Sequence, residues 1–201
     1  MAQEPSNPPW WHRAVRVGML SFMLAAAVNW VGDLTMSVVP AVVAFLVVLV
    51  LIGTGVVFDI LGTAVTAAEQ PPLNAMAAKR VSGARQALWL VRNADRVANF
   101  ANDVVGDVSG AVSGAAGTTV ALQFSDAMNG GRLLDHIVSL AMIGLIAGLT
   151  VGGKAAGKRF AIDNATHVVV VAGRVIGALE QMTGRSFTGG RGPNAARRRT
   201  T

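Results

Sequence analysis

The sequence predicts an all-α integral membrane protein with four transmembrane helices and juxtamembrane amphipathic helices. Hydrophobic residues make up 52% of the 201 residues and charged residues only 14%, whereas an ordinary soluble domain carries about 25% charged residues. The 23 glycines suit closely packed helices in a bilayer, because small residues let helix backbones approach. The absence of cysteine excludes disulfides and thiolate metal sites.

The first apolar stretch covers residues 17–32. Trp11 and Trp30 bracket it nineteen residues apart, which corresponds to about 28 Å of helix. That length matches a hydrocarbon core of about 30 Å with a tryptophan at each interface. The alternative is a cleaved signal peptide, because residues 25–27 are small and resemble a cleavage site. We expect residues 1–37 to form a cytoplasmic arm and this extra helix.

The second stretch gives the strongest membrane signal. It begins at Val38, carries Pro40 in its first turn and stays apolar to Phe58. Proline is tolerated in the first turn of a helix. A polar interruption follows, and we expect the helix to continue to about Ala68.

Two further stretches complete the expected set of four spans. Residues 97–122 give a weaker signal because Asp103 and Asp107 lie inside them. Residues 133–151 are uncharged apart from Asp135 near their start.

The basic residues predict the orientation of the chain. Sixteen of the seventeen Lys and Arg residues precede the first span, lie between the second and third, or follow the fourth, and Arg132 is the exception. The positive-inside rule places both termini in the cytoplasm of a multi-pass plasma-membrane protein. Topology thus explains the net charge of +6, and we expect no nucleic-acid partner.

Two amphipathic stretches flank these spans. The apolar residues of 73–96 recur near helical spacing opposite lysines and arginines, which predicts one or two juxtamembrane helices with a lipid-facing role. Residues 167–182 suit an interfacial helix, although 168–171 suit a strand equally well. We assign 38–183 to the membrane domain and expect 184–201 to form a disordered basic tail.

Three carboxylates inside the expected spans require an explanation. A carboxylate near the bilayer centre costs at least about 2.5 to 3.5 kcal/mol on insertion scales. From the expected helix ends, Asp59, Asp103 and Asp107 lie about 13, 9 and 15 Å into the membrane from the cytoplasmic side. All three therefore fall at one level, where oxygen ligands from two helices are expected to converge.

The chemistry of this cluster favours a hard cation. Asp103 and Asp107 are four residues apart and share a helical face with Asn102 and Gly106, and Thr63 lies one turn from Asp59. Oxygen-rich sites without sulfur suit Mg²⁺ or Na⁺. The alternative is that the carboxylates are neutral or form ion pairs. Their expected partners would be Lys154 and Lys158 at the foot of the fourth span.

Glycines repeat every four residues on the third and fourth spans. Such ridges allow close helix crossing, within one protomer or between two. The two sets are Gly106, Gly110 and Gly114, and Gly144, Gly148 and Gly152.

Four sequence features follow each other along the chain: Phe58-Asp-Ile-Leu-Gly-Thr-Ala-Val-Thr66, Leu90-Val-Arg-Asn-Ala-Asp-Arg-Val97, Asn102 and Gly153-Lys-Ala-Ala-Gly-Lys158. Together they resemble the membrane domain of the CorC/CNNM family of magnesium transport proteins. No single motif is specific, but their order and spacing over residues 45–183 are similar to those of the family.

The resemblance implies a homodimer with three family-like spans per chain, here preceded by one extra span. It also implies a dehydrated Mg²⁺ held between helices by side chains and backbone carbonyls, with Na⁺ as the coupling ion. Carried onto this sequence together with the acidic cluster, the expected metal ligands are Asp59, Thr63, Asn102, Asp103, Gly106, Asp107 and Gly153.

The sequence departs from the family pattern at important positions. Asp59 replaces the family serine, and Gly62 replaces the glutamate of the same motif. Gly106 replaces the second asparagine, while Lys154 and Gly157 replace the glutamate and proline of the later motif. The regulatory CBS pair of the family is absent from this sequence, so we expect regulation by a separate cytosolic partner.

These observations support a non-enzymatic membrane protein that binds and transports a divalent cation, with Mg²⁺ first. The alternative is a degenerate, non-transporting relative that acts as a membrane scaffold or sensor. An intramembrane aspartyl protease is the enzymatic rival, because Asp59 and Asp107 lie on neighbouring spans. Its usual Tyr-Asp and Gly-x-Gly-Asp signatures are both incomplete here.

Overall fold

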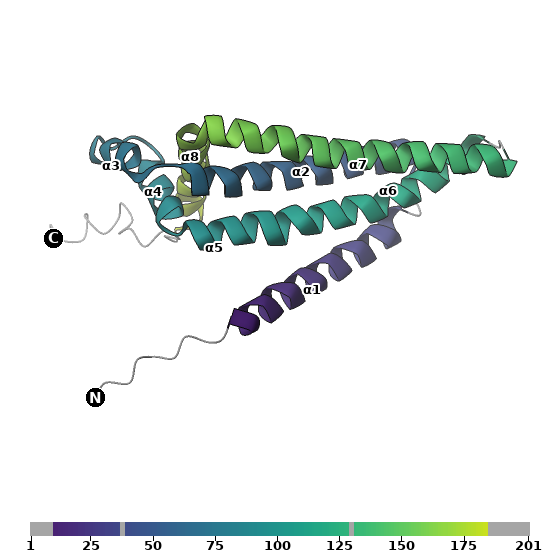
Figure 1. The fold of residues 1–201 in the computed structure, drawn as a ribbon, viewed down its shortest axis with the longest axis horizontal. Helices are drawn as coiled ribbons and strands as arrows, with labels where there is room; N and C mark the ends of the chain where they lie inside the picture. The colour runs from purple at the N-terminus through teal and green to yellow at the C-terminus, as the bar shows by residue number, and fades with distance from the viewer. Residues whose placement is uncertain (1–9, 37–38, 129–130, 185–201) are drawn as a thin grey trace. The chain divides into compact units, whose positions relative to one another are not determined.

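The computed structural model describes residues 10–36, 39–128 and 131–184, and within them it contains helices and no strand (Figure 1). The predicted all-α class is confirmed for this part of the chain. Residues 1–9 of the expected arm and residues 185–201 of the expected tail at 184–201 lie outside the described residues. The helices are α1 (Trp10–Met36), α2 (Ala41–Ala67), α3 (Gln70–Ala78), α4 (Ala84–Arg92), α5 (Ala94–Ala98), the π-helix η1 (Asn99–Gly106), α6 (Asp107–Met128), α7 (Gly131–Asp163) and α8 (Ala165–Thr183).

Two helices are long and apolar enough to cross a membrane. They are α2 over Ala41–Ala67 and α7 over Leu133–Asp163, whereas the apolar run in α1, Ala14–Val28, is shorter. These two helices favour a membrane protein.

α2 ends at Ala67, as expected, whereas α7 is longer than expected. α2 passes without a break through the predicted polar interruption after Phe58, because a single carboxylate does not prevent backbone hydrogen bonding within a helix. α7 continues twelve residues past Val151, to Asp163, since no proline interrupts that segment.

The third predicted stretch is not one α-helix. It consists of α5, the eight-residue π-helix η1 and α6. π-helical turns are rare and occur frequently at functional sites. Asn102, Asp103 and Gly106 of the predicted site all lie in this one, and Asp107 follows it directly.

The chain divides into two compact units. The first unit comprises residues 1–56 and 102–154, and the second comprises residues 57–101 and 155–201. In the first unit, α1 contacts α6, and α2, α6 and α7 share an apolar core. The core residues are Ala44, Val48, Ile52, Ala116, Val120 and Ile146.

Glycine allows close approach in the first unit, but mostly at positions outside the predicted ridges. A Cβ on Gly117 would collide with the end of the Ile146 side chain, and one on Gly55 would lie 3.0 Å from Cβ of Ser109. By contrast, a Cβ added at four of the six predicted ridge positions meets nothing within 4 Å, and one at Gly110 has only Thr150 nearby, 3.9 Å away. The ridge positions that meet nothing are Gly114, Gly144, Gly148 and Gly152.

The second unit is built around α4 and α8. Its core combines the ends of α2 and α7 with α3, α4 and α8, and includes Leu73, Ala87 and Val169, which are fully buried. The two helices cross most closely where Gly83 meets Gly173. A Cβ on Gly173 would collide with the Gly83 carbonyl oxygen, and Gly83 has a φ of +82°, a conformation that favours glycine.

The apolar side of residues 73–96 does not face lipid as predicted. The segment forms two helices, as expected, but α8 and the ends of α2 and α7 cover their apolar sides. The periodicity identified the apolar side correctly, but this side packs against other helices rather than against lipid. The buried residues are Leu73, Ala84, Ala87, Leu90 and Val91.

α8 is a helix throughout, so the strand alternative for 168–171 is wrong. One side of α8 is buried in the core of the second unit, at Ala165, Val169, Val170 and Gly173. Another side leaves an apolar stripe exposed. This stripe comprises Val171, Val175, Leu179 and Met182.

Candidate functional site

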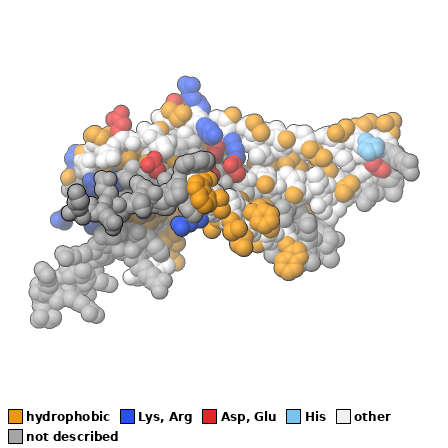
Figure 2. Space-filling model, turned by 60° about the horizontal axis from the view of Figure 1, so that its bottom comes forward, with side chains coloured by type: hydrophobic (Ala, Val, Ile, Leu, Met, Phe, Trp, Pro, Cys, Tyr) orange, Lys and Arg blue, Asp and Glu red, His pale blue; other side chains and the backbone are white. Residues whose placement is uncertain are grey.

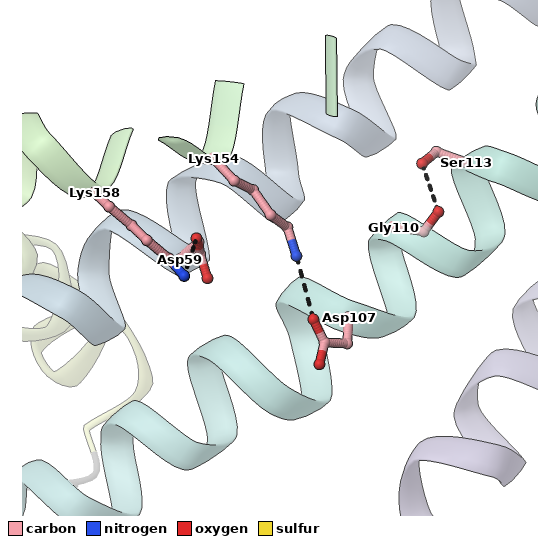
Figure 3. Close-up of polar contacts among 6 residues, drawn as sticks. All are labelled: Asp59, Asp107, Gly110, Ser113, Lys154 and Lys158. Atoms are coloured by element: carbon pink, nitrogen blue, oxygen red, sulfur yellow. Dashed lines mark hydrogen bonds and ion pairs between the residues drawn. The ribbon is translucent and has the colours of Figure 1, made fainter. Parts of the chain in front are cut away.

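Each unit contains one predicted site carboxylate next to a lysine of α7 (Figure 3). In the first unit, Lys154 Nζ donates a hydrogen bond of 3.2 Å to Asp107 Oδ1. In the second unit, Lys158 Nζ lies 3.7 Å from Asp59 Oδ2. The ion pairs that the sequence offered as an alternative are therefore present.

Asp59 is the more unusual of the two carboxylates. It lies inside the apolar helix α2, and the residue is only 3% exposed. Its Oδ2 accepts no hydrogen bond from the described residues, and 3.7 Å is a charge contact rather than a hydrogen bond. A buried carboxylate needs both a counter-charge and hydrogen bonds. Asp59 has the first, whereas its buried Oδ2 lacks the second.

Thr63, the predicted neighbour of Asp59, lies one turn further along α2 and is half-buried. The hydroxyl of Thr66 donates a 2.8 Å hydrogen bond to the Thr63 carbonyl. Within this turn, one threonine hydroxyl is thus used by the backbone of its own helix, which is the usual local bonding of threonine in helices.

Asp107 has a different environment. Its side chain is 73% exposed, whereas that of Lys154 is 21% exposed. The stem of the lysine is packed against the protein while its ammonium reaches the carboxylate. An ion pair with one exposed partner is weaker than a buried pair, because the surroundings screen the charges.

The π-helix supplies the remaining oxygen atoms of the first unit. Asn102 Oδ1 is buried and has no hydrogen-bond partner among the described residues, while Asp103 is exposed. Gly106 is buried, and its carbonyl oxygen would lie 3.4 Å from a Cβ added at Gly55. Gly153 approaches α2 in the same way, because a Cβ there would lie 3.0 Å from Val56.

Among the described residues, no group of three or more His, Cys, Asp or Glu side chains is arranged to hold a metal ion. Each unit offers a carboxylate already beside an ammonium. Asp59 and Thr63 belong to the second unit and the other five predicted ligands to the first. Their convergence into one site stays a prediction.

One polar pair escaped the sequence analysis. Ser125 is 3% exposed, and its hydroxyl donates a 2.5 Å hydrogen bond to Asp135 Oδ1. The two residues are equally distant in sequence from position 130, between α6 and α7. Residues placed symmetrically about a short connection face each other in antiparallel helices, so this spacing was the available signal.

The fold and these pairs define the class of the protein: a helical protein with two candidate membrane-spanning helices and acidic side chains paired to lysines of α7. No known protein family, curated protein or solved structure matches the chain. The resemblance to the CorC/CNNM membrane domain rests on the motif residues alone.

Proposed function

We propose that this chain is an integral membrane protein that binds a divalent cation, Mg²⁺ first, at carboxylates within the membrane and transports it. In this proposal, Lys158 and Lys154 act as tethered cations that neutralise Asp59 and Asp107 when the metal ion is absent. The observation that carries the proposal is the buried Asp59 carboxylate in an apolar helix, with an oxygen that accepts no hydrogen bond from the described residues.

A structural role explains this carboxylate poorly. An ionised group in lipid is costly and is usually retained for function. The ammonium of Lys158 is 3.7 Å away, and its side chain is 55% exposed, so it can move aside without being stranded in an apolar environment. A hard cation with oxygen preference would then replace it at the carboxylate.

The first unit offers compatible chemistry. Asn102 contributes a buried amide oxygen without a hydrogen bond, and Asp103 and Asp107 contribute exposed carboxylates. Carboxylate and amide oxygens are common ligands of hard divalent cations. We include Thr63, Gly106 and Gly153 as further oxygen donors, as the resemblance implies.

The proposal extends to four spans, a homodimer in the plasma membrane, both termini in the cytoplasm and Na⁺ as coupling ion. The distribution of basic residues and the CorC/CNNM resemblance support it. Because the chain has no cysteine, Ser6→Cys and Ser186→Cys give single labelling sites. Both should react with a membrane-impermeant maleimide only after cells are opened. Labelling of either site in intact cells contradicts this topology.

The transport claim is tested in proteoliposomes containing a Mg²⁺-sensitive dye. Asp59→Asn should lower the initial Mg²⁺ flux at least tenfold, because it removes the buried charge that replaces the hydration shell of the ion. Asp163→Asn is the matched control, since Asp163 is an exposed acid paired with Arg159, and it should retain wild-type flux. Equal flux in wild type and Asp59→Asn contradicts the proposal. Replacing the Na⁺ gradient by K⁺ tests the coupling ion.

The tethered-cation role of Lys158 gives a second readout. Lys158→Gln removes the competing ammonium, so thermal stabilisation of the purified protein should require less Mg²⁺ than in the wild type. Ca²⁺ should stabilise less at the same concentration. A midpoint that does not respond to Mg²⁺ in either protein contradicts metal binding.

The second candidate is a non-transporting scaffold or sensor, favoured by the fact that both acids already have lysine partners. There the ion pairs would hold helices together, and a separate cytosolic partner would read the state of the protein. Crosslinking to an unrelated membrane partner, combined with no Mg²⁺-dependent stabilisation, supports this candidate over transport.

A further inference from the structure

The outer side of α4 differs from its buried side. Ala84, Ala87, Leu90 and Val91 are buried in the core of the second unit. Arg85, Trp89 and Arg92 follow each other at intervals of four and three residues and are all exposed. Such spacing places the three side chains along one helical face. We call Arg85, Trp89 and Arg92 the outer face of α4.

The two arginines of this outer face have no acidic partner among the described residues. Neither guanidinium forms an ion pair or a side-chain hydrogen bond with any described residue, and α4 contains no acidic residue. The two arginines are seven residues apart, or about 10 Å along the helix. Figure 2 shows separate Lys and Arg side chains on the surface, interspersed with acidic and hydrophobic ones.

The length of α7 and the packing of α4 bear on where this face lies relative to a membrane. α7 has 33 residues, or about 50 Å, whereas a bilayer with its headgroups is about 40–45 Å thick. If α7 spans the membrane, its last turns reach the headgroup layer. α8 begins two residues after α7 ends, and α4 packs on α8. In that case, and with the orientation of the proposed function, α4 lies at the level of the cytoplasmic headgroups.

We propose that the outer face of α4 binds the headgroups of anionic phospholipids in the cytoplasmic leaflet. Arginine forms paired hydrogen bonds with phosphate oxygens through its planar guanidinium. Tryptophan prefers the membrane interface, where its ring meets apolar chains and its N–H meets polar groups. Basic residues next to a span are attracted to anionic lipids. This inference rests on the membrane location in the proposed function, but not on transport.

Native mass spectrometry of the full chain in detergent tests the binding of phosphatidylglycerol against phosphatidylcholine. The wild type should retain several-fold more phosphatidylglycerol. The double variant Arg85→Gln with Arg92→Gln should lose this preference, because the phosphate contacts are removed. The matched control is Lys79→Gln with Arg159→Gln, which removes two exposed charges elsewhere in the second unit and should keep the preference. Equal losses in both double variants indicate bulk charge only and overturn the proposal.

A fluorescence measurement locates the lipid. A variant with Trp10, Trp11 and Trp30 changed to Phe keeps Trp89 as its single tryptophan. In vesicles, brominated phosphatidylglycerol should quench Trp89 more strongly than brominated phosphatidylcholine at equal total bromine. Equal quenching by both lipids overturns the preference.

Two further controls separate the sources of failure. Glycerol phosphate added in solution should not compete with the lipid, and full competition identifies free phosphate as the ligand and overturns the proposal. Alkaline carbonate extraction tests membrane insertion itself. If the protein is released, the membrane location and this inference fail together, whereas loss of flux with intact lipid preference affects only the transport proposal.

Discussion

Each of the two units contains an aspartate–lysine pair, and the two pairs differ in how far the aspartate is buried. Asp59 of the second unit is buried and holds Lys158 at 3.7 Å, whereas the Asp107 side chain of the first unit is 73% exposed and accepts a hydrogen bond from Lys154. Both pairs consist of an aspartate and a lysine. The carboxylate of Asp59 is closed off from its surroundings, whereas that of Asp107 is open to them. Burial, rather than distance, decides what happens when the lysine is removed.

The closely packed glycines of the two units also differ in how easily the neighbouring atoms can move. In the second unit Gly173 packs on the backbone oxygen of Gly83, which cannot move independently of its helix. In the first unit Gly117 packs on the Cδ1 end of Ile146, which can change rotamer. The second unit should therefore tolerate substitutions less well than the first.

The largest effect is expected for Lys158→Met. This change leaves the Asp59 carboxylate buried and without a counter-charge, so thermal unfolding in detergent should show a loss of about 3–5 kcal/mol. Adding Asp59→Leu to the same chain should recover most of the loss, because the apolar pair needs no charge compensation. A single variant as stable as the wild type contradicts the role of Lys158 as the counter-charge of Asp59.

Gly173→Ala should have the next largest effect. The new methyl group meets the Gly83 carbonyl, and separating α4 from α8 should destabilise the protein by about 1–3 kcal/mol. Hydrogen exchange should rise in α4 and α8 more than in α6. An unchanged exchange rate in α4 contradicts the tight crossing.

A smaller effect is expected for Ser125→Ala. It removes the hydrogen bond to Asp135, and such a bond to a charged group contributes about 1.5–3 kcal/mol at most. Because Asp135 is only half-buried, other groups can replace part of that bond, and a loss of about 1 kcal/mol is expected by thermal unfolding. Ser139→Ala, on the following turn of α7, serves as the control and should be neutral.

The smallest effect should come from Lys154→Met. Asp107 keeps access to its surroundings when the lysine is removed, so the loss in thermal unfolding should stay below about 1 kcal/mol. A loss as large as that of Lys158→Met would mean that Asp107 is covered in the assembled protein, for example by a second protomer.

The sequence predicted the helices well because long apolar runs and helical periodicity are local properties. It also indicated that Lys154 and Lys158 are partners of the acids, since they are four residues apart at the foot of an apolar run. It did not predict the π-helix η1, because sequence periodicity distinguishes a helix from a strand but does not reveal a rare local widening of the helical turn. It also assigned lipid to the apolar side of α4, since periodicity identifies a side and not what covers it.

The candidate site was predictable only in part for a similar reason. Asp59, Asn102 and Asp107 attract notice because polar residues are unexpected in apolar runs. The burial that separates Asp59 from Asp107 depends on which neighbouring helices lie beside each residue. That information is spread over positions far apart in the chain.

The crossing of Gly83 with Gly173 also affects the order in which the protein can be made. The two residues are ninety positions apart, so α4 leaves the ribosome long before α8 exists, and its apolar side must be shielded during that interval. Contacts between distant segments form slowly, and unpaired apolar surface invites aggregation. Synthesis stopped before residue 165 should thus yield a chain that requires a chaperone or is degraded.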